Sequence, residues 1–122
     1  MLGIDAPLDF DGHPLALGDR VTFGLVASCN NCFFCQVAGL PQKCTNQFKY
    51  GHTACDSKLA LTGGLSEYIY LVPGTSIFRV PPMVSDEVAA TAMCAGATLA
   101  HALDGVKVPR FSSILLIGMG ML

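Results

Sequence analysis

The sequence predicts a mixed β and α/β fold, in which a barrel-like β region is followed by a linking helix and by the first strand of an α/β sheet. Three observations predict it: short β-rich runs between Gly and Pro turns, one Ala- and Leu-rich stretch without proline, and an apolar run that ends in Gly-x-Gly. We therefore expect three parts, at residues 1–84, 85–110 and 111–122.

Three β runs are expected in the first part. Each is rich in β-branched or aromatic residues and borders a turn signal, such as Gly18 with Asp19 or Pro73 with Gly74. The expected strands are residues 20–26, 66–72 and 76–80. Short strands between such turns are typical of barrel-like β domains.

A helix is expected over residues 88–103. Ser85 is a good N-cap, and Asp86 and Glu87 place negative charge on the first turn, where the helix dipole favours it. Gly105 suits the C-terminal cap.

The apolar run at residues 113–117 leads into Gly118-Met119-Gly120. A strand buried on both faces that enters a Gly-x-Gly turn is how a doubly wound nucleotide-binding sheet begins. The glycine pair alone is a weak signal, because the full fingerprint needs a third glycine and a later acidic residue.

Composition limits the classes of function. Of the 122 residues, 52% are hydrophobic and only 13% are charged, where about 25% charged is typical. A body this small cannot bury so much apolar surface alone, so we expect a partner or a larger parent protein. The apolar runs are shorter than the ~18–20 residues of a membrane-spanning helix, and the N-terminus lacks signal-peptide features. A net charge of −2 gives no basic patch. We therefore expect no membrane or nucleic-acid partner, and a cytoplasmic location.

Four cysteines mark a metal lobe at about residues 28–47. Cys29, Cys32, Cys35 and Cys44 stand as Cys-x2-Cys-x2-Cys-x8-Cys. Two-residue gaps let successive thiolates turn toward one point, and four thiolates fill a tetrahedral Zn²⁺ site without an open position. A structural zinc is the favoured interpretation, and buried or redox cysteines without metal are the alternative.

Other cysteines carry weaker signals. From the residues alone, Cys94 is a core cysteine on an apolar helix face. His101 lies about two turns further on, which is too distant for easy chelation. A second metal site at His52 and Cys55 is conceivable, but we treat both as loop residues.

These pieces in this order resemble the zinc-dependent medium-chain alcohol dehydrogenases over nearly the whole chain. The matching segments are GDRV at 18–21, the cysteine lobe, GGLSEY at 63–68, CAGAT at 94–98 and ILLIGMG at 114–120. The resemblance implies a GroES-like barrel portion followed by a truncated Rossmann domain. The sequence from GLPQKC to KYGH also resembles that of a subgroup associated with phosphonate breakdown. The family usually has seven residues before the fourth cysteine of the lobe, and this chain has eight.

The resemblance changes the expected role of Cys94. In the family the matching cysteine binds a catalytic zinc, and the matching threonine, Thr98, lies against the nicotinamide ring. Gly118 and Gly120 would belong to the coenzyme site. The implied parent enzyme uses zinc and NAD or NADP to transfer hydride to or from a small alcohol or carbonyl compound. It would be a homo-oligomer, a dimer or tetramer.

The chain also departs from the family. The earlier catalytic ligands, a cysteine and a His-Glu pair, have no match, because no cysteine precedes Cys29 and His13 is followed by Pro14. We therefore expect the chain to be an internal fragment of the enzyme that is inactive by itself. The alternatives are a non-catalytic structural-zinc interaction module and, more remotely, a secreted disulfide domain.

Overall fold

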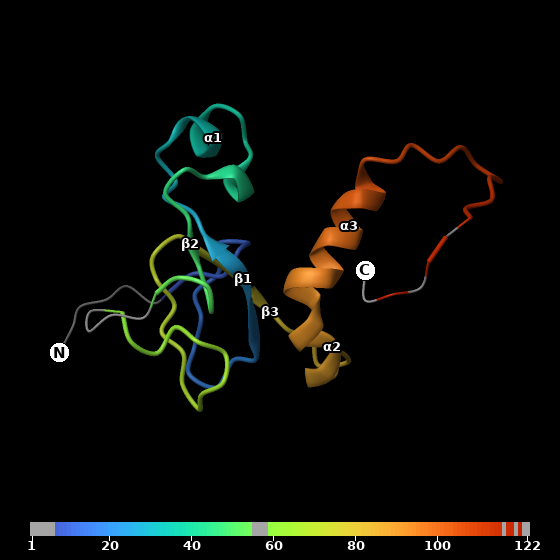
Figure 1. Cartoon of the computed structure of the whole chain (residues 1–122). Coiled ribbons are helices and arrows are strands. Elements are labelled where there is room, and N and C mark those ends of the chain that lie inside the picture. The colour runs from blue at the N-terminus through green and yellow to red at the C-terminus, as the bar shows by residue number, and fades with distance from the viewer. Residues whose placement is uncertain (1–6, 55–58, 116, 119, 121–122) are drawn as a thin grey trace. The chain divides into compact units, whose positions relative to one another are not determined.

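The computed structural model describes residues 7–54, 59–115, 117, 118 and 120. The chain divides into two compact units, Met1–Arg79 and Val80–Leu122. The first unit contains β1 (Val21–Ala27), α1 (Phe33–Gln36), the 3₁₀ turn η1 (Pro41–Lys43), β2 (Phe48–Lys49) and β3 (Thr75–Arg79) (Figure 1). The second unit contains α2 (Asp86–Thr91), the π-helical segment η2 (Ala92–Gly96) and α3 (Ala97–Asp104).

The first unit is built on a three-stranded antiparallel sheet with the order β2-β1-β3. β1 and β3 match the strands predicted at residues 20–26 and 76–80 to within one residue at each end. Their register shifts between Phe23 and Ala27, where β1 has more residues than its partner. Such a bulge bends the strand, and it lies just before the cysteine segment.

The strand predicted at residues 66–72 is wrong, because the structure has no strand there. Local bonds take the place of a ladder: the Ser66 hydroxyl donates to the carbonyls of Gly63 and Tyr68, and the Val72 N–H donates to the Tyr50 hydroxyl. Tyr68 is 77% exposed, so this segment lacks the half-buried face that sustains a strand.

Tyr50 is the centre of the small core in the first unit. It is 4% exposed, and its ring makes edge-on contacts with Phe23 and Phe48 at centroid distances of 5.4 and 5.2 Å. Its hydroxyl lies 2.6 Å from the Thr75 hydroxyl and accepts the Val72 N–H at 2.7 Å. One side chain therefore joins β1, β2 and β3.

A buried carboxylate ties the N-terminal segment to β3. Asp9 accepts the N–H of His13 at 2.8 Å and the Nε–H of Arg79 at 2.9 Å. Arg79 also donates to Asp19 at 2.7 Å and to the Pro14 carbonyl. The His13 N–H, acting with Arg79 against the effect of burial, holds the pKa of Asp9 below its ordinary value.

The second unit contains the predicted helix, which begins at Asp86. Ser85 accepts the N–H of Val88 at 3.5 Å, and the acidic residues of the first turn face the positive end of the helix dipole. Gly105 follows α3 as its C-cap. None of the helices in the part of the chain that the structure describes is both long and apolar enough to cross a membrane.

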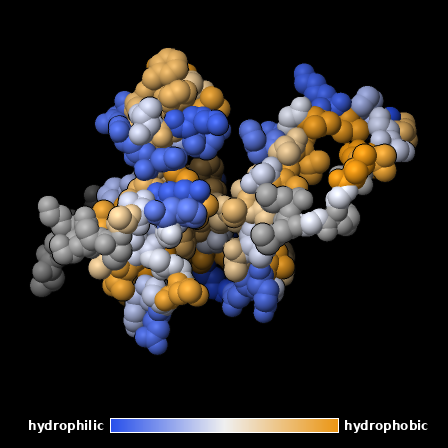
Figure 2. Space-filling view, viewed as in Figure 1, coloured by the Kyte–Doolittle hydropathy of each residue, from blue (hydrophilic) through white to orange (hydrophobic). Residues whose placement is uncertain are grey.

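The strand predicted at residues 113–117 is absent from the described residues of that run, and residue 116 lies outside them. Leu115 and Ile117 are 83% and 91% exposed. A strand of this apolar kind is stable only with neighbouring strands and covering helices, and no strand in the described residues pairs with this run. Figure 2 shows such hydrophobic residues at the molecular surface in orange, as the composition led us to expect.

Candidate functional site

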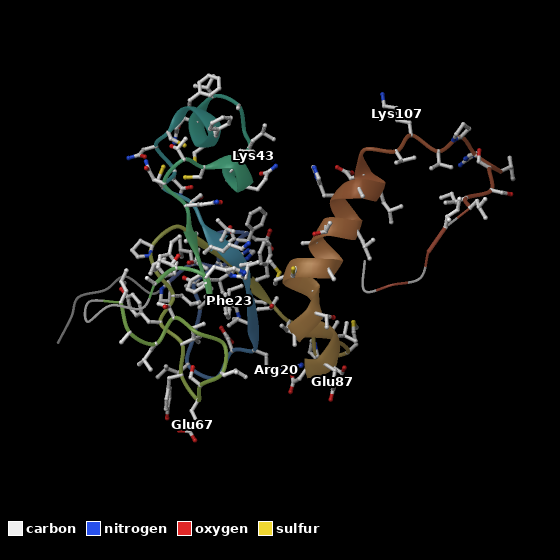
Figure 3. The ribbon with its side chains drawn as sticks, viewed as in Figure 1. Arg20, Phe23, Lys43, Glu67, Glu87 and Lys107 are labelled. Carbon is white, nitrogen blue, oxygen red and sulfur yellow. The ribbon has the colours of Figure 1, made fainter. Side chains whose placement is uncertain are left out.

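The sulfur atoms of the cysteine quartet converge on one point. The four Sγ atoms all lie within 4.8 Å of one another. Cys29 and Cys44 are 3.4 Å apart, and Cys32 and Cys35 are 3.5 Å apart. Four sulfurs around a tetrahedral Zn²⁺ at ~2.3 Å lie about 3.8 Å from one another. The quartet therefore fits zinc with sub-ångström movements of its closest pairs, in the lobe that carries Lys43 (Figure 3).

Local turns bring these sulfurs together. Asn30 adopts a left-handed conformation with φ 55°, which Asn tolerates better than most residues, and it reverses the chain after Cys29. Cys32 then caps α1, and its carbonyl accepts the Cys35 N–H at 3.1 Å. The turn η1 returns the chain to Cys44, whose N–H donates to the Pro41 carbonyl at 3.0 Å.

Backbone N–H groups donate to the most buried sulfur of the quartet. Cys44 is 4% exposed, and its Sγ accepts the N–H groups of Cys29 and Asn46 at 3.3 and 3.4 Å. Bonds of this kind hold a metal ligand in a fixed orientation.

The thiols of the quartet differ in how readily they ionise. The backbone N–H groups of Thr45 and Cys35 lower the pKa of Cys32 to about 5. Burial, together with the neighbouring Cys32, raises the pKa of Cys35 to about 11. The pKa of Cys29 is also lowered, chiefly by the Asn31 N–H, so Cys29 and Cys32 are favoured as thiolates while burial favours the thiol form of Cys35. A bound divalent cation would favour the deprotonated form of every ligand thiol.

Asp9, Asp11 and His13 also have ligand atoms within 4.8 Å of one another. Asp9 already accepts backbone N–H groups on one oxygen and Arg79 on the other. Its carboxylate is therefore engaged in holding the N-terminal segment, and this group is not a metal site. No local sequence pattern marks the Asp9–Arg79 pair, because the two residues are 70 positions apart.

Cys94 lies in the second unit, at the middle of η2. It is exposed, so its interpretation as a core cysteine is wrong. The Thr98 hydroxyl donates to the Cys94 carbonyl at 2.8 Å. His101 is also exposed, on α3, and among the described residues it does not belong with Cys94 to any group of three or more possible metal ligands.

The remaining predicted residues are placed as follows. Gly118 has φ +94°, a conformation that suits glycine in a tight turn, and Gly120 lies in a bend. His52 is exposed in a loop, where its Nδ1 lies 3.0 Å from the Tyr50 carbonyl. Cys55 lies outside the described residues.

Comparison with known proteins finds similar dehydrogenases. D-arabinitol dehydrogenase 1 of Uromyces fabae is 31% identical over 104 residues, which are 85% of this chain and 27% of that protein. NADP-dependent alcohol dehydrogenase C of Mycobacterium bovis is 34% identical over 106 residues, which are 84% of this chain and 30% of that protein. No protein-family model matches the chain.

A solved structure of an alcohol dehydrogenase is also similar to this chain. The crystal structure of an alcohol dehydrogenase from Thermotoga maritima matches 83% of this chain and 28% of its own length, with a TM-score of 0.74 and 33% identity. The chain therefore spans less than a third of the length of each of these proteins.

Proposed function

We propose that this chain, which belongs with the medium-chain alcohol dehydrogenases, forms the structural-zinc lobe and part of the active-site region of a zinc- and NAD(P)-dependent alcohol dehydrogenase or reductase. Its similarity to alcohol dehydrogenases covers more than four fifths of its length. The observation that carries the proposal is the convergence of four sulfurs at zinc-like spacing in the segment where the family resemblance puts its lobe.

In this proposal the quartet has a structural role. Cys29, Cys32, Cys35 and Cys44 hold one zinc through four thiolates, so no position is open to water or substrate. The zinc joins the strand end after Ala27 to α1 and η1, because its ligands come from both sides of the lobe. Its contribution is to the folding of the lobe.

Cys94 has the catalytic role. Its exposed thiol supplies one ligand to a second zinc, and further ligands, a cysteine and a His-Glu pair, would come from sequence beyond this chain. Zinc with an open position polarises an alcohol or carbonyl oxygen, while the nicotinamide exchanges hydride. Thr98 and the glycines Gly118 and Gly120 contribute to the coenzyme site.

The remaining features of the proposal are broader. The substrate is a small alcohol or carbonyl compound, the coenzyme is NAD or NADP, and the parent protein is a dimer or tetramer. Its location is the cytoplasm, where a reducing environment keeps the cysteines available as thiolate ligands.

Substitutions in the full-length parent protein separate the two roles. Cys94→Ser should abolish turnover, remove one zinc per subunit and leave the melting temperature close to that of the wild type. Cys32→Ser should lower the melting temperature, because it opens the structural site. Retained activity in Cys94→Ser, or equal loss of thermal stability in both variants, contradicts these roles.

A non-catalytic zinc module is the second candidate function. Two observations favour it: among the described residues Cys94 belongs to no group of three or more possible metal ligands, and the sequence has no Gly-His-Glu match. Zinc analysis of the 122-residue chain is informative for both candidates, since each requires one bound zinc that is lost in Cys32→Ser. Turnover by the full-length parent protein decides for the enzyme.

A further inference from the structure

Two sulfurs of the quartet are close neighbours on a single turn of the chain. The Sγ atoms of Cys32 and Cys35 lie 3.5 Å apart, and the Cys35 N–H donates to the Cys32 carbonyl at 3.1 Å. A turn closed in this way keeps the Cα atoms of its ends within about 7 Å, and a disulfide joins residues whose Cα atoms are about 4.4–6.8 Å apart. This pair can therefore form a disulfide mainly through rotation of its side chains.

Exposure distinguishes this pair from the other close pair of the quartet. The Sγ atoms of Cys29 and Cys44 are 3.4 Å apart, but Cys44 is 4% exposed and its sulfur accepts two backbone N–H groups. Cys32 and Cys35 are both partly exposed. Because oxidation of cysteine requires access to its sulfur, an oxidant reaches either member of this pair but only one member of the other.

We propose that Cys32 and Cys35 form an oxidation site, at which a hydroperoxide joins two ligands of the structural zinc in a disulfide and thereby releases the metal. The presence of zinc rests on the proposed function, whereas the proximity and exposure of the two sulfurs are properties of this chain. The thiolate is both the metal ligand and the nucleophilic form of cysteine, so the state that binds zinc is also the state that a peroxide oxidises.

The reaction has two steps and consumes one peroxide. The thiolate of Cys32 or Cys35 attacks an oxygen of the hydroperoxide, the O–O bond breaks, and the products are a sulfenic acid and an alkoxide, or hydroxide from hydrogen peroxide. The neighbouring thiolate then attacks the sulfenic sulfur, the S–S bond forms and hydroxide leaves. The two sulfurs together lose two electrons, which reduce the peroxide.

The disulfide leaves the site with only the thiolates of Cys29 and Cys44. A structural zinc site uses four protein ligands, and metal binding contributes to the folding of such a lobe. Oxidation should therefore release the metal and loosen the lobe. The change is reversible, because thiols reduce a disulfide by exchange.

Trypsin digestion separates the candidate pairings. It gives one peptide of residues 21–43 and another of residues 44–49. A disulfide between Cys32 and Cys35 closes a loop within the first peptide, whereas any disulfide of Cys44 joins the two peptides.

The experiment treats the zinc-loaded chain with hydrogen peroxide, after Cys55→Ser and Cys94→Ser have removed the two cysteines outside the quartet. Released zinc is followed with a chromogenic chelator, and the remaining thiols are alkylated before digestion. We expect one zinc released for every two thiols lost, a looped peptide 21–43 with Cys29 alkylated, and an alkylated peptide 44–49. Dithiothreitol and zinc should restore the starting state, because a disulfide is reversible and a sulfinic acid is not.

Three results would overturn the proposal: a first product that joins peptides 21–43 and 44–49, sulfinic acids in place of a disulfide, or zinc retained after the two thiols are lost. A matched pair of variants tests the pairing without metal, since Cys44→Ser and Cys35→Ser each remove one ligand. Cys44→Ser should form the loop as fast as the metal-free parent sequence, and Cys35→Ser should lose it. Equally fast loop formation in both variants contradicts the assignment. If the reduced chain binds no zinc, the structural site of the proposed function fails, while the metal-free digests still decide which sulfurs pair.

Discussion

Gly74 makes a backbone contact at the entrance to the metal lobe that no other residue type could make. Its carbonyl accepts the N–H of Ser28 at 3.1 Å, one residue before Cys29. Its φ is +87°, and a Cβ atom added to it would lie 2.0 Å from the Ser28 carbonyl oxygen. The Ser28 oxygen is a backbone atom, and the position of a Cβ is fixed by its own backbone, so neither atom can rotate away. Gly74→Ala must therefore separate the segment around Gly74 from the segment that leads into the cysteine quartet.

The cost has two parts. A left-handed conformation costs an L-residue roughly 1–2 kcal/mol, and forcing extra atoms into a packed contact typically costs about 1–3 kcal/mol. We expect Gly74→Ala to lower the free energy of unfolding by about 2–5 kcal/mol. Gly12 isolates the first part, since it has φ +84° and nothing within 4 Å of an added Cβ. Gly12→Ala should cost about 1–2 kcal/mol.

Urea unfolding of the zinc-loaded chain, followed by far-UV circular dichroism, measures both variants. With a slope of about 1–3 kcal/mol per molar urea, the clash should place the midpoint of Gly74→Ala roughly 1 M below that of Gly12→Ala. Equal midpoints would refute the reasoning, because the two variants share the left-handed conformation and differ in the contact with Ser28. A lower slope in one variant would show a change in the unfolded state instead.

Two further substitutions test the core and the N-terminal anchor. Tyr50→Phe should destabilise the chain by about 1–3 kcal/mol in urea unfolding, because the partly buried Val72 N–H loses its acceptor; an unchanged midpoint would contradict the role of the hydroxyl. The N–H of His13 and the Arg79 guanidinium lower the pKa of Asp9 below 3.8. The ionised carboxylate therefore stabilises the fold above that pH. This contribution is lost as the pH falls through the lower pKa of the folded state. Asp9→Asn should therefore be less stable than the wild type at neutral pH, with a difference in melting temperature that narrows under acid conditions; a constant difference would exclude the carboxylate.

The sequence was most informative where the structure is determined locally. The cap at Ser85, the Gly and Pro turns and the spacing of the cysteines all act over a few residues, and they predicted the helix, β1, β3 and the convergence of the quartet. The resemblance to alcohol dehydrogenases rested on the same short segments, and the comparisons confirm it.

The features that the sequence did not predict depend on distant contacts or on backbone detail. Residues 66–72 have a strand-like composition, but the Tyr50 hydroxyl and local serine bonds engage their backbone instead. Asp9 and Arg79 meet across 70 positions of sequence, and no local pattern marks such a pair. The sequence does not predict the π-helical segment at Cys94 either, because Ala, Gly and Thr also occur in ordinary α-helices.

The two cysteine sites differ in how much of the protein they need. All four ligands of the quartet lie within residues 29–44, so the turns of one short segment are enough to bring the sulfurs together. Among the described residues, Cys94 belongs to no group of three or more possible metal ligands, and catalytic zinc sites use three protein ligands. Under the proposed function, zinc binding and catalysis should therefore separate in this chain: the quartet would supply all four ligands of the structural zinc, whereas Cys94 would supply one ligand of the catalytic zinc and would act only together with ligands from other parts of the protein.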